Sequence, residues 1–190
     1  MVELEREFTY LVEELPEDLS EFPSVIVEDN YVPMGAEHPT LRIRRKGEKY
    51  EVTKKCPVDS EDGGQSGDSS RHVEHTTPLT RAEYEVLNSC EGKRLIKRRV
   101  FYEADGVKSD IDVFLGEMMG LVTADFEFSD DEEMKRFVKP GFVGADVSQE
   151  LMIAGGMLCG KCFSDVGEGL GEKYGYRAVV GVEKFGEGGK

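Results

Sequence analysis

Six stretches of this chain alternate apolar residues with charged or polar ones, which is the period of two that a β-strand gives its side chains. The first stretch, residues 2–8, places Glu3, Glu5 and Glu7 at every second position. The other stretches are residues 41–44, 51–55, 96–101, 109–114 and 124–128. This pattern predicts short, antiparallel strands, each with one apolar face and one charged face.

The charged faces are sorted by sign. Residues 2–8, 109–114 and 124–128 carry acids on that face, and the other three stretches carry bases. Two interpretations compete. In the first, the strands are half-buried and their charged faces meet water. In the second, the sheet closes with these faces inward, so that the acids hold divalent cations and the bases hold an anion. The sorting by sign favours the second interpretation.

Helices are predicted outside the sheet. Two capping boxes start helices, one with Thr80 and Glu83 and one with Ser129 and Glu132, and a third helix is predicted after residues 146–149. These helices would cover the apolar strand faces, formed by Leu4, Ile43, Val52, Ile111, Val113 and Phe126. We therefore expect an α+β fold, an antiparallel eight-stranded β-barrel with a charged lumen and helices packed outside. A barrel of this size can hold one small ligand.

A length of 190 residues suits a single domain over residues 1–190. We expect the barrel strands over residues 2–128 and the C-terminal helices over residues 130–185. Residues 57–70 are rich in Ser, Asp and Gly, and this composition predicts a mobile surface loop.

The formal net charge of −15 argues against a general nucleic-acid binder, because such proteins neutralise phosphates with a basic surface. No stretch approaches the ~20 apolar residues of a membrane span. The acidic N-terminus does not resemble a signal peptide, so a cytoplasmic location is expected. The cysteines show no disulfide framework. Cys159 and Cys162 have C-x-x-C spacing without the second pair that a zinc site needs, and their role stays open, as does a homodimer.

The charged stretches resemble, in order and spacing, the signatures of the CYTH superfamily, the triphosphate tunnel metalloenzymes. The resemblance spans residues 2–150 and rests on Glu3-Leu4-Glu5-Arg6, Arg42-Ile43-Arg44, Thr53-Lys54-Lys55, Asp110-Ile111-Asp112-Val113-Phe114 and Asp125-Phe126-Glu127-Phe128. One E-x-E motif alone would be uninformative, whereas the ordered series is specific. It implies a β-tunnel that binds a triphosphate.

The resemblance also implies residue roles. Two divalent cations, Mg²⁺ or Mn²⁺, would neutralise the polyphosphate and position a water. The implied metal ligands are Glu3, Glu5 and Glu127, supported by Asp112 and Asp125. Catalytic roles are implied for Glu5, Asp112 and Asp125. The implied triphosphate-binding residues are Arg42, Arg44, Lys55, Lys97 and Arg99, because arginine donates paired hydrogen bonds to phosphate oxygens and lysine acts as a point charge.

Glu7 departs from the family pattern. The first motif is usually E-x-E-x-K, and Glu7 stands at the position of the lysine. Arg6 cannot replace that lysine, because neighbouring residues of a strand point to opposite faces. Glu7 is either an additional metal ligand or a block on a phosphate subsite in a tunnel that binds without turnover. We favour the metal ligand.

Three functions stay open. The first is metal-dependent hydrolysis of a triphosphate, either inorganic tripolyphosphate or a nucleoside or thiamine triphosphate. The second is an adenylate cyclase of class IV type, slightly disfavoured because no base-recognition pocket is recognisable. The third is a non-catalytic polyphosphate- or nucleotide-binding module. Hydrolysis is our prediction, with a small-molecule triphosphate as partner and with neither nucleic acid nor membrane involved.

Overall fold

The structure is a computed structural model that describes residues 2–4, 6–57, 72–104 and 106–186. The chain divides into two compact units. The first comprises Met1–Glu5, Val27–Leu95 and Gln149–Gly160, and the second comprises Arg6–Ile26, Ile96–Ser148 and Lys161–Lys190. Strands β3 (Ser24–Val32) and β7 (Lys93–Ala104) contribute residues to both units. Residues 58–70 of the predicted loop lie outside the described residues.

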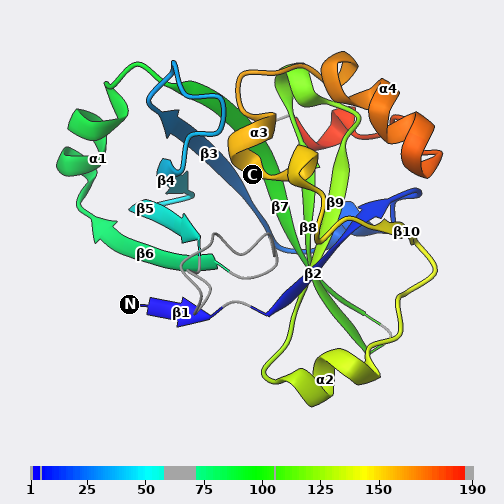
Figure 1. Ribbon diagram of the computed structural model, residues 1–190. Coiled ribbons are helices and arrows are strands. Elements are labelled where there is room, and N and C mark those ends of the chain that lie inside the picture. Colours follow the sequence, from blue (N-terminus) through cyan, green and yellow to red (C-terminus); the bar gives the residue numbers. More distant parts are fainter. Residues whose placement is uncertain (1, 5, 58–71, 105, 187–190) are drawn as a thin grey trace, which may run out of the picture. The chain divides into compact units, whose positions relative to one another are not determined.

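The first unit contains an antiparallel sheet in the order β1-β6-β5-β4-β3 (Figure 1). Besides β3, its strands are β1 (Val2–Leu4), β4 (Leu41–Lys46), β5 (Lys49–Pro57) and β6 (His72–Leu79). Helix α1 (Arg81–Asn88) follows β6 and confirms the first capping box: Thr80 Oγ1 accepts from Glu83 N, and the Glu83 carboxylate accepts from Thr80 N. Tyr84 of α1 packs on Tyr50 with ring centroids 4.9 Å apart. The cap and this contact fix where the helix begins and which face it buries.

The predicted third helix is broken into two short turns in the first unit. These are η3 (Leu151–Ile153) and α3 (Gly155–Leu158), and the intervening Ala154 has ψ 134°, which is not helical. Glycine is needed here because the backbone comes close to its neighbours. A Cβ on Gly155 would lie 2.2 Å from the Tyr31 hydroxyl, and one on Gly156 would lie 2.6 Å from the carbonyl oxygen of Pro39.

The second unit contains strands in the order β7-β8-β9-β2-β10 (Figure 1). They are β2 (Glu7–Val12), β8 (Val107–Phe114), β9 (Val122–Glu127) and β10 (Val143–Asp146), together with β7. Its helices and turns are η1 (Leu19–Glu21), η2 (Gly116–Met118), α2 (Asp131–Arg136), α4 (Phe163–Tyr174) and η4 (Glu183–Phe185). The alternating stretches over residues 96–101 and 109–114 lie on β7 and β8, which pair antiparallel. Helix α4 lies within residues 130–185, where C-terminal helices were expected, but its glycine-rich sequence did not predict its bounds.

The apolar face of the strands of the second unit is buried, as the alternation predicted. Val100, Ile111, Val113 and Phe126 are each at most 2% exposed. Phe137, which follows α2, contacts the rings on this face at centroid distances from 4.8 to 6.0 Å. Helix α2 is capped by Asp130, whose side chain accepts from two backbone N–H groups, rather than by the predicted Ser129.

Two features of the predicted barrel are wrong. The described residues form ten strands rather than eight, and in neither unit does the order of the described strands close on itself. The predicted first strand, residues 2–8, is divided: β1 pairs with β6, whereas β2 pairs with β9. The short β10 adds a further strand. The alternation of residues could not show these changes, because it reports the face of a side chain and not the partner of its strand.

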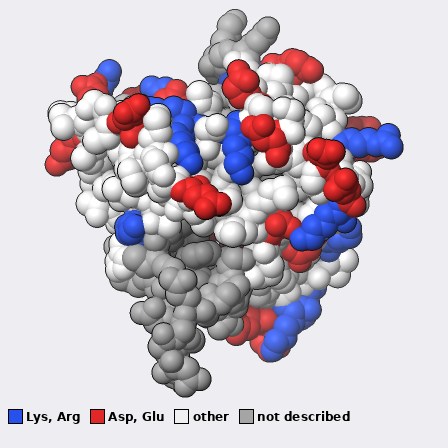
Figure 2. Space-filling model, turned by 45° about the horizontal axis from the view of Figure 1, so that its top comes forward, with Lys and Arg blue, Asp and Glu red and all other residues white. Residues whose placement is uncertain are grey.

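Acidic and basic side chains are interspersed on the face of the molecule that Figure 2 displays. The net charge of −15 is therefore not gathered into one acidic patch on that face. Within the described part of the chain, no helix combines the length and the apolar character needed to cross a membrane.

Candidate functional site

One face of the strands of the second unit carries most of the charged residues that the sequence singled out. The strand register places Arg99 opposite Asp112, Asp110 opposite Asp125, and Glu7 opposite Glu127. Directly opposed residues of antiparallel strands have their Cβ atoms about 4.5–5.5 Å apart and point to the same face. The predicted charged face therefore exists across four neighbouring strands of this unit.

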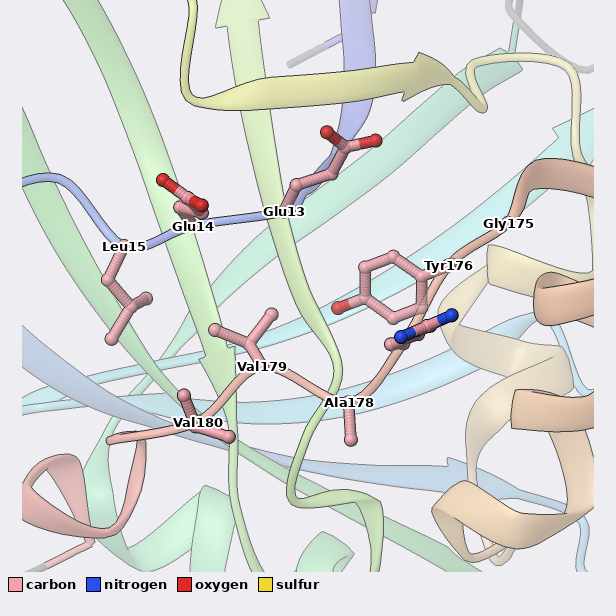
Figure 3. A pocket seen from close by; sticks show the side chains of 9 residues that line it. Glu13, Glu14, Leu15, Gly175, Tyr176, Ala178, Val179 and Val180 are labelled. Atoms are coloured by element: carbon pink, nitrogen blue, oxygen red, sulfur yellow. The ribbon is translucent and has the colours of Figure 1, made fainter.

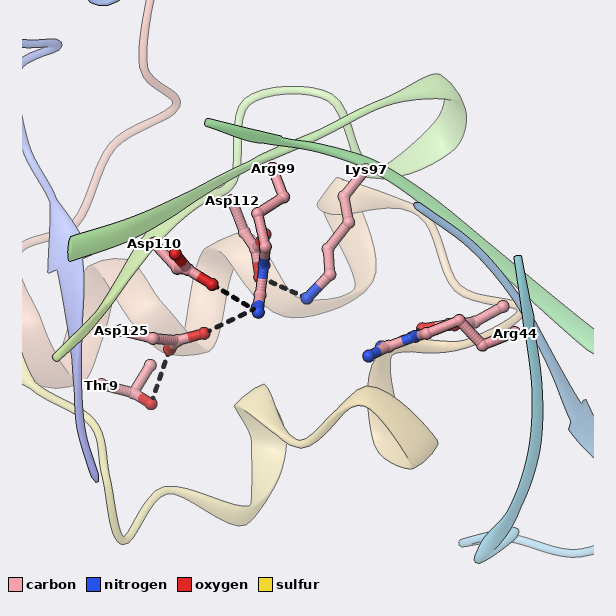
Figure 4. Close-up of polar contacts among 8 residues, drawn as sticks. Thr9, Arg44, Lys97, Arg99, Asp110, Asp112 and Asp125 are labelled. Carbon is pink, nitrogen blue, oxygen red and sulfur yellow. Dashed lines mark hydrogen bonds and ion pairs between the residues drawn. The ribbon is translucent and has the colours of Figure 1, made fainter. Parts of the chain in front are cut away.

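Arg99 is the centre of this face (Figure 4). Its Nε donates to Asp112 Oδ1 over 2.8 Å and its Nη2 to Asp112 Oδ2 over 2.6 Å, a bidentate pair. Nη1 donates to Asp110 Oδ2 over 2.9 Å, and Nη2 also donates to Asp125 Oδ2 over 3.0 Å. Lys97 Nζ donates to Asp112 Oδ2. The acids and bases that were assigned to metal and phosphate thus bind one another in a network of two cations and three carboxylates.

The carboxylates of this network differ in protonation behaviour. The Asp112 side chain is only 1% exposed, and this burial would raise its pKa, but the charges of Lys97 and Arg99 outweigh burial and hold the pKa well below its usual range. Burial, and after it the charge of Asp112, raises the pKa of Asp125. Asp112 therefore carries a fixed negative charge, and Asp125 is the carboxylate better suited to exchange a proton.

The basic residues predicted in the first unit have specific partners as well. Arg44 donates to both carboxylate oxygens of Asp29, over 2.7 and 2.8 Å, and the Asp29 side chain is 2% exposed. Arg42 Nη2 donates to Thr53 Oγ1 over 3.3 Å. The buried carboxylate of Asp29 therefore holds Arg44 in a defined orientation. Burial, and after it the charge of Asp29, also raises the pKa of Tyr31 to about 12, so this hydroxyl stays protonated at neutral pH.

Sequence reasoning missed two residues that orient these groups. Asp29 lies on β3, which is not among the six alternating stretches of the sequence analysis. Thr9 Oγ1 donates to Asp125 Oδ1 over 2.9 Å, and Thr9 lies two residues after Glu7 on β2. Both positions continue an alternation, Asp29 with Tyr31 and Thr9 with Glu7, so a longer reading of each strand would have placed them on the charged faces.

The remaining predicted residues are only partly described. Glu3 of β1 and Lys55 of β5 each lie opposite Glu74 of β6 in the backbone register. Glu5 lies outside the described residues. Glu127 ends β9 and is exposed. The metal-binding roles of these acids therefore stay predictions.

The two cysteines of the C-x-x-C spacing belong to different units. Cys159 is buried and donates to the carbonyl oxygen of Gly156. Cys162 precedes α4, where its backbone N–H donates to Asp165 over 2.8 Å. Each cysteine thus has a local structural contact.

The chemistry of the carboxylates fits a hard divalent cation, because Mg²⁺ and Mn²⁺ prefer oxygen ligands. Asp110, Asp112 and Asp125 all direct an oxygen toward one guanidinium. Among the described side chains, however, no group of three or more His, Cys, Asp or Glu residues is arranged to hold one metal ion. The carboxylate oxygens are suitable ligands for such a metal ion, but in the structure they are gathered around Arg99.

A separate pocket of about 650 Å³ lies in the second unit (Figure 3). It is lined by residues 13–15 and 175–180, and none of the predicted site residues contributes to it. Glu13 and Glu14 face it against a single base, Arg177. This balance of charge does not suit a polyanion, so the charged sheet face is the better candidate site.

Comparisons with known proteins give two related enzymes, although no family model matches the chain. The inorganic triphosphatase of Nitrosomonas europaea is 28% identical over 152 residues, which cover 79% of this chain and 91% of that protein. The inorganic triphosphatase of Acetivibrio thermocellus is 29% identical over 109 residues, which cover 57% of this chain and 64% of that protein. A crystal structure of an inorganic triphosphatase matches with a TM-score of 0.57 at 24% identity, covering 83% of this chain and 95% of that one.

These similarities support the assignment to the CYTH superfamily that the ordered charged motifs implied. In this chain the motif over residues 110–114 lies on β8 and the motif over residues 125–128 begins on β9. These two strands are paired, which brings Asp110 and Asp125 together at Arg99.

Proposed function

We propose that this CYTH protein hydrolyses a triphosphate with divalent metal ions, and that inorganic tripolyphosphate is its first candidate substrate. Two relatives that are named inorganic triphosphatases support the substrate class. The observation that carries the proposal is the network around Arg99, in which phosphate-binding cations and metal-binding carboxylates stand side by side on paired strands. Polyphosphate hydrolysis needs both kinds of group close together, because the negative charge of the polyphosphate must be neutralised before a water molecule can attack it.

The carboxylates would serve as metal ligands and the bases as phosphate ligands. Bound Mg²⁺ or Mn²⁺, two ions by family resemblance, would neutralise phosphate charge and lower the pKa of a water. The proposed metal-binding residues are Glu3, Glu5, Glu7, Asp112, Asp125 and Glu127. The proposed phosphate-binding residues are Lys97 and Arg99 of the second unit and Arg42, Arg44 and Lys55 of the first. Asp29 would orient Arg44 by its bidentate contact.

Asp125 is the proposed proton acceptor. Hydrolysis forms one O–P bond from water, breaks one P–O–P bond and releases phosphate and pyrophosphate, so the attacking water must lose a proton. A general base works best with a pKa near the working pH. Without bound metal, burial and the neighbouring Asp112 raise the pKa of Asp125, and Thr9 donates to its Oδ1.

The test is an assay of phosphate and pyrophosphate release from tripolyphosphate, ATP and thiamine triphosphate, with Mg²⁺, Mn²⁺ or a chelator. We expect metal-dependent release from tripolyphosphate. Asp125→Asn and Glu127→Gln should lose most of it, whereas Glu172→Gln, a change on the exposed surface of α4, should keep wild-type activity. Full activity of both site variants, or full activity with the chelator, would refute the proposal.

A second candidate function is binding of polyphosphate without turnover. Glu7, which stands where the family has a lysine, is the observation that favours it. In the same assay this function would appear as a rise of the melting temperature on addition of tripolyphosphate, without release of phosphate from any substrate. Release of pyrophosphate with formation of cyclic AMP from ATP would instead indicate the cyclase.

A further inference from the structure

We propose that Arg99 and Lys97 are displaceable counter-ions of the carboxylate cluster, so that binding of the anion and binding of the metal each promote the other. The proposal rests on the function proposed above and describes the regulation of that same site. In the structure, Arg99 and Lys97 form ion pairs with the carboxylates. A metal ion or a phosphate can bind there only when some of these ion pairs break.

Arg99 cannot keep all of its hydrogen bonds to the carboxylates and also form a bidentate contact with a phosphate group. A guanidinium has five N–H donors, and four hydrogen bonds run from Arg99 to Asp110, Asp112 and Asp125. A bidentate contact with a phosphate group needs two N–H donors. Arg99 must therefore release at least one carboxylate oxygen to bind a phosphate in this way.

The charges of the cluster supply the coupling. Two cations face three carboxylates, which leaves the cluster with one negative charge in excess. When a phosphate draws Lys97 and Arg99 away, the three carboxylates lose their counter-ions in a site where Asp112 is 1% exposed. Buried carboxylates without a cation are costly, so their affinity for a divalent cation must rise. Linkage requires the reverse effect to be equal in magnitude.

The first experiment measures Mg²⁺ binding by calorimetry without any triphosphate. Arg99→Gln removes the resident cation, and we expect it to bind Mg²⁺ at least about fivefold more tightly than the wild type, the lower end of common coupling. Mg²⁺ should also raise the melting temperature of Arg99→Gln by more than that of the wild type. The matched control is Arg136→Gln, which removes the same charge from an exposed position on α2 and should bind Mg²⁺ as the wild type does. Equal or weaker Mg²⁺ binding by Arg99→Gln would overturn the proposal.

A second experiment needs no variant at this site, in case Arg99→Gln does not fold. Mg²⁺ is titrated into the wild type in sodium sulfate and in sodium chloride of equal ionic strength, with sulfate as the probe for a phosphoryl group. We expect Mg²⁺ affinity to be at least about fivefold higher in sulfate. Equal affinity in the two salts would overturn the proposal.

These outcomes are separate from the outcome of the hydrolysis assay. A wild type that hydrolyses tripolyphosphate but shows no coupling in either titration would refute the displaceable counter-ions and leave the proposed function standing. The expected coupling in a protein that releases no phosphate would refute hydrolysis and leave the counter-ions standing.

Discussion

Glu7 of β2 lies directly opposite Glu127 of β9. Like charges at directly opposed positions of an antiparallel pair destabilise it. The family's usual lysine at this position would instead face Glu127 as an opposite charge. A cation bound by both carboxylates, as proposed above, would remove this repulsion.

We predict that Glu7→Lys binds Mg²⁺ more weakly than the wild type and hydrolyses tripolyphosphate more slowly, because it removes a proposed metal ligand. Without metal, the same variant should be more stable by about 0.2–1 kcal/mol, because an opposed pair of unlike charges replaces a pair of like charges. Calorimetric titration with Mg²⁺ and urea unfolding measure the two effects. Glu172→Lys, on the exposed surface of α4, is the control. Unchanged Mg²⁺ affinity and stoichiometry, with tighter triphosphate binding, would show that Glu7 blocks a phosphate subsite.

Asp29→Ala should destabilise the protein by about 3–5 kcal/mol, because it leaves the guanidinium of Arg44 without its buried bidentate partner. Equilibrium unfolding in urea measures the loss. Glu85→Ala is the matched control, since it breaks an exposed ion pair with Arg81 on α1 and should leave stability nearly unchanged. A loss below ~1 kcal/mol for Asp29→Ala would contradict the buried pairing.

Gly155→Ala should destabilise the protein by about 1–3 kcal/mol, because the new Cβ would lie 2.2 Å from the Tyr31 hydroxyl. The cost should be smaller in a Tyr31→Phe background, which lacks that oxygen, so a double-mutant cycle should give a clear coupling. Gly35→Ala is the control, as its Cβ would have no neighbour within 4 Å. Equal costs of Gly155→Ala in both backgrounds would refute the contact.

Ionisation of Tyr31 should lower the free energy of unfolding at alkaline pH. Its pKa is raised to about 12 in the folded state, from 10 in the unfolded chain, so the folded state holds the proton more tightly. The resulting stability is fully present below pH 10 and is lost as the pH rises from about 10 to about 12, by about 1 kcal/mol per pH unit. Urea unfolding at pH 9 and pH 11 should show a smaller loss for Tyr31→Phe, which cannot ionise. The same loss in both proteins would contradict the prediction.

The sequence by itself determined which residues share a face, where several elements begin, and the resemblance to a family. The Thr80–Glu83 capping box and the charged alternation of β8 and β9 are confirmed because they depend on residues within a few positions of one another. The glycine-rich helix α4 and the broken segment at Ala154 could not be predicted in this way, since contacts with the rest of their units outweigh weak local propensities.

Only the tertiary structure decided which acidic side chain pairs with which basic side chain. Arg99 joins Asp125 across 26 positions of the chain, and Thr9 joins Asp125 across 116. The period of two assigns a side chain to a face, but the order and register of the strands choose its neighbour, and both are set by long-range pairing. The acids and bases that the motifs assigned to metal and to phosphate are for this reason found bonded to one another around Arg99.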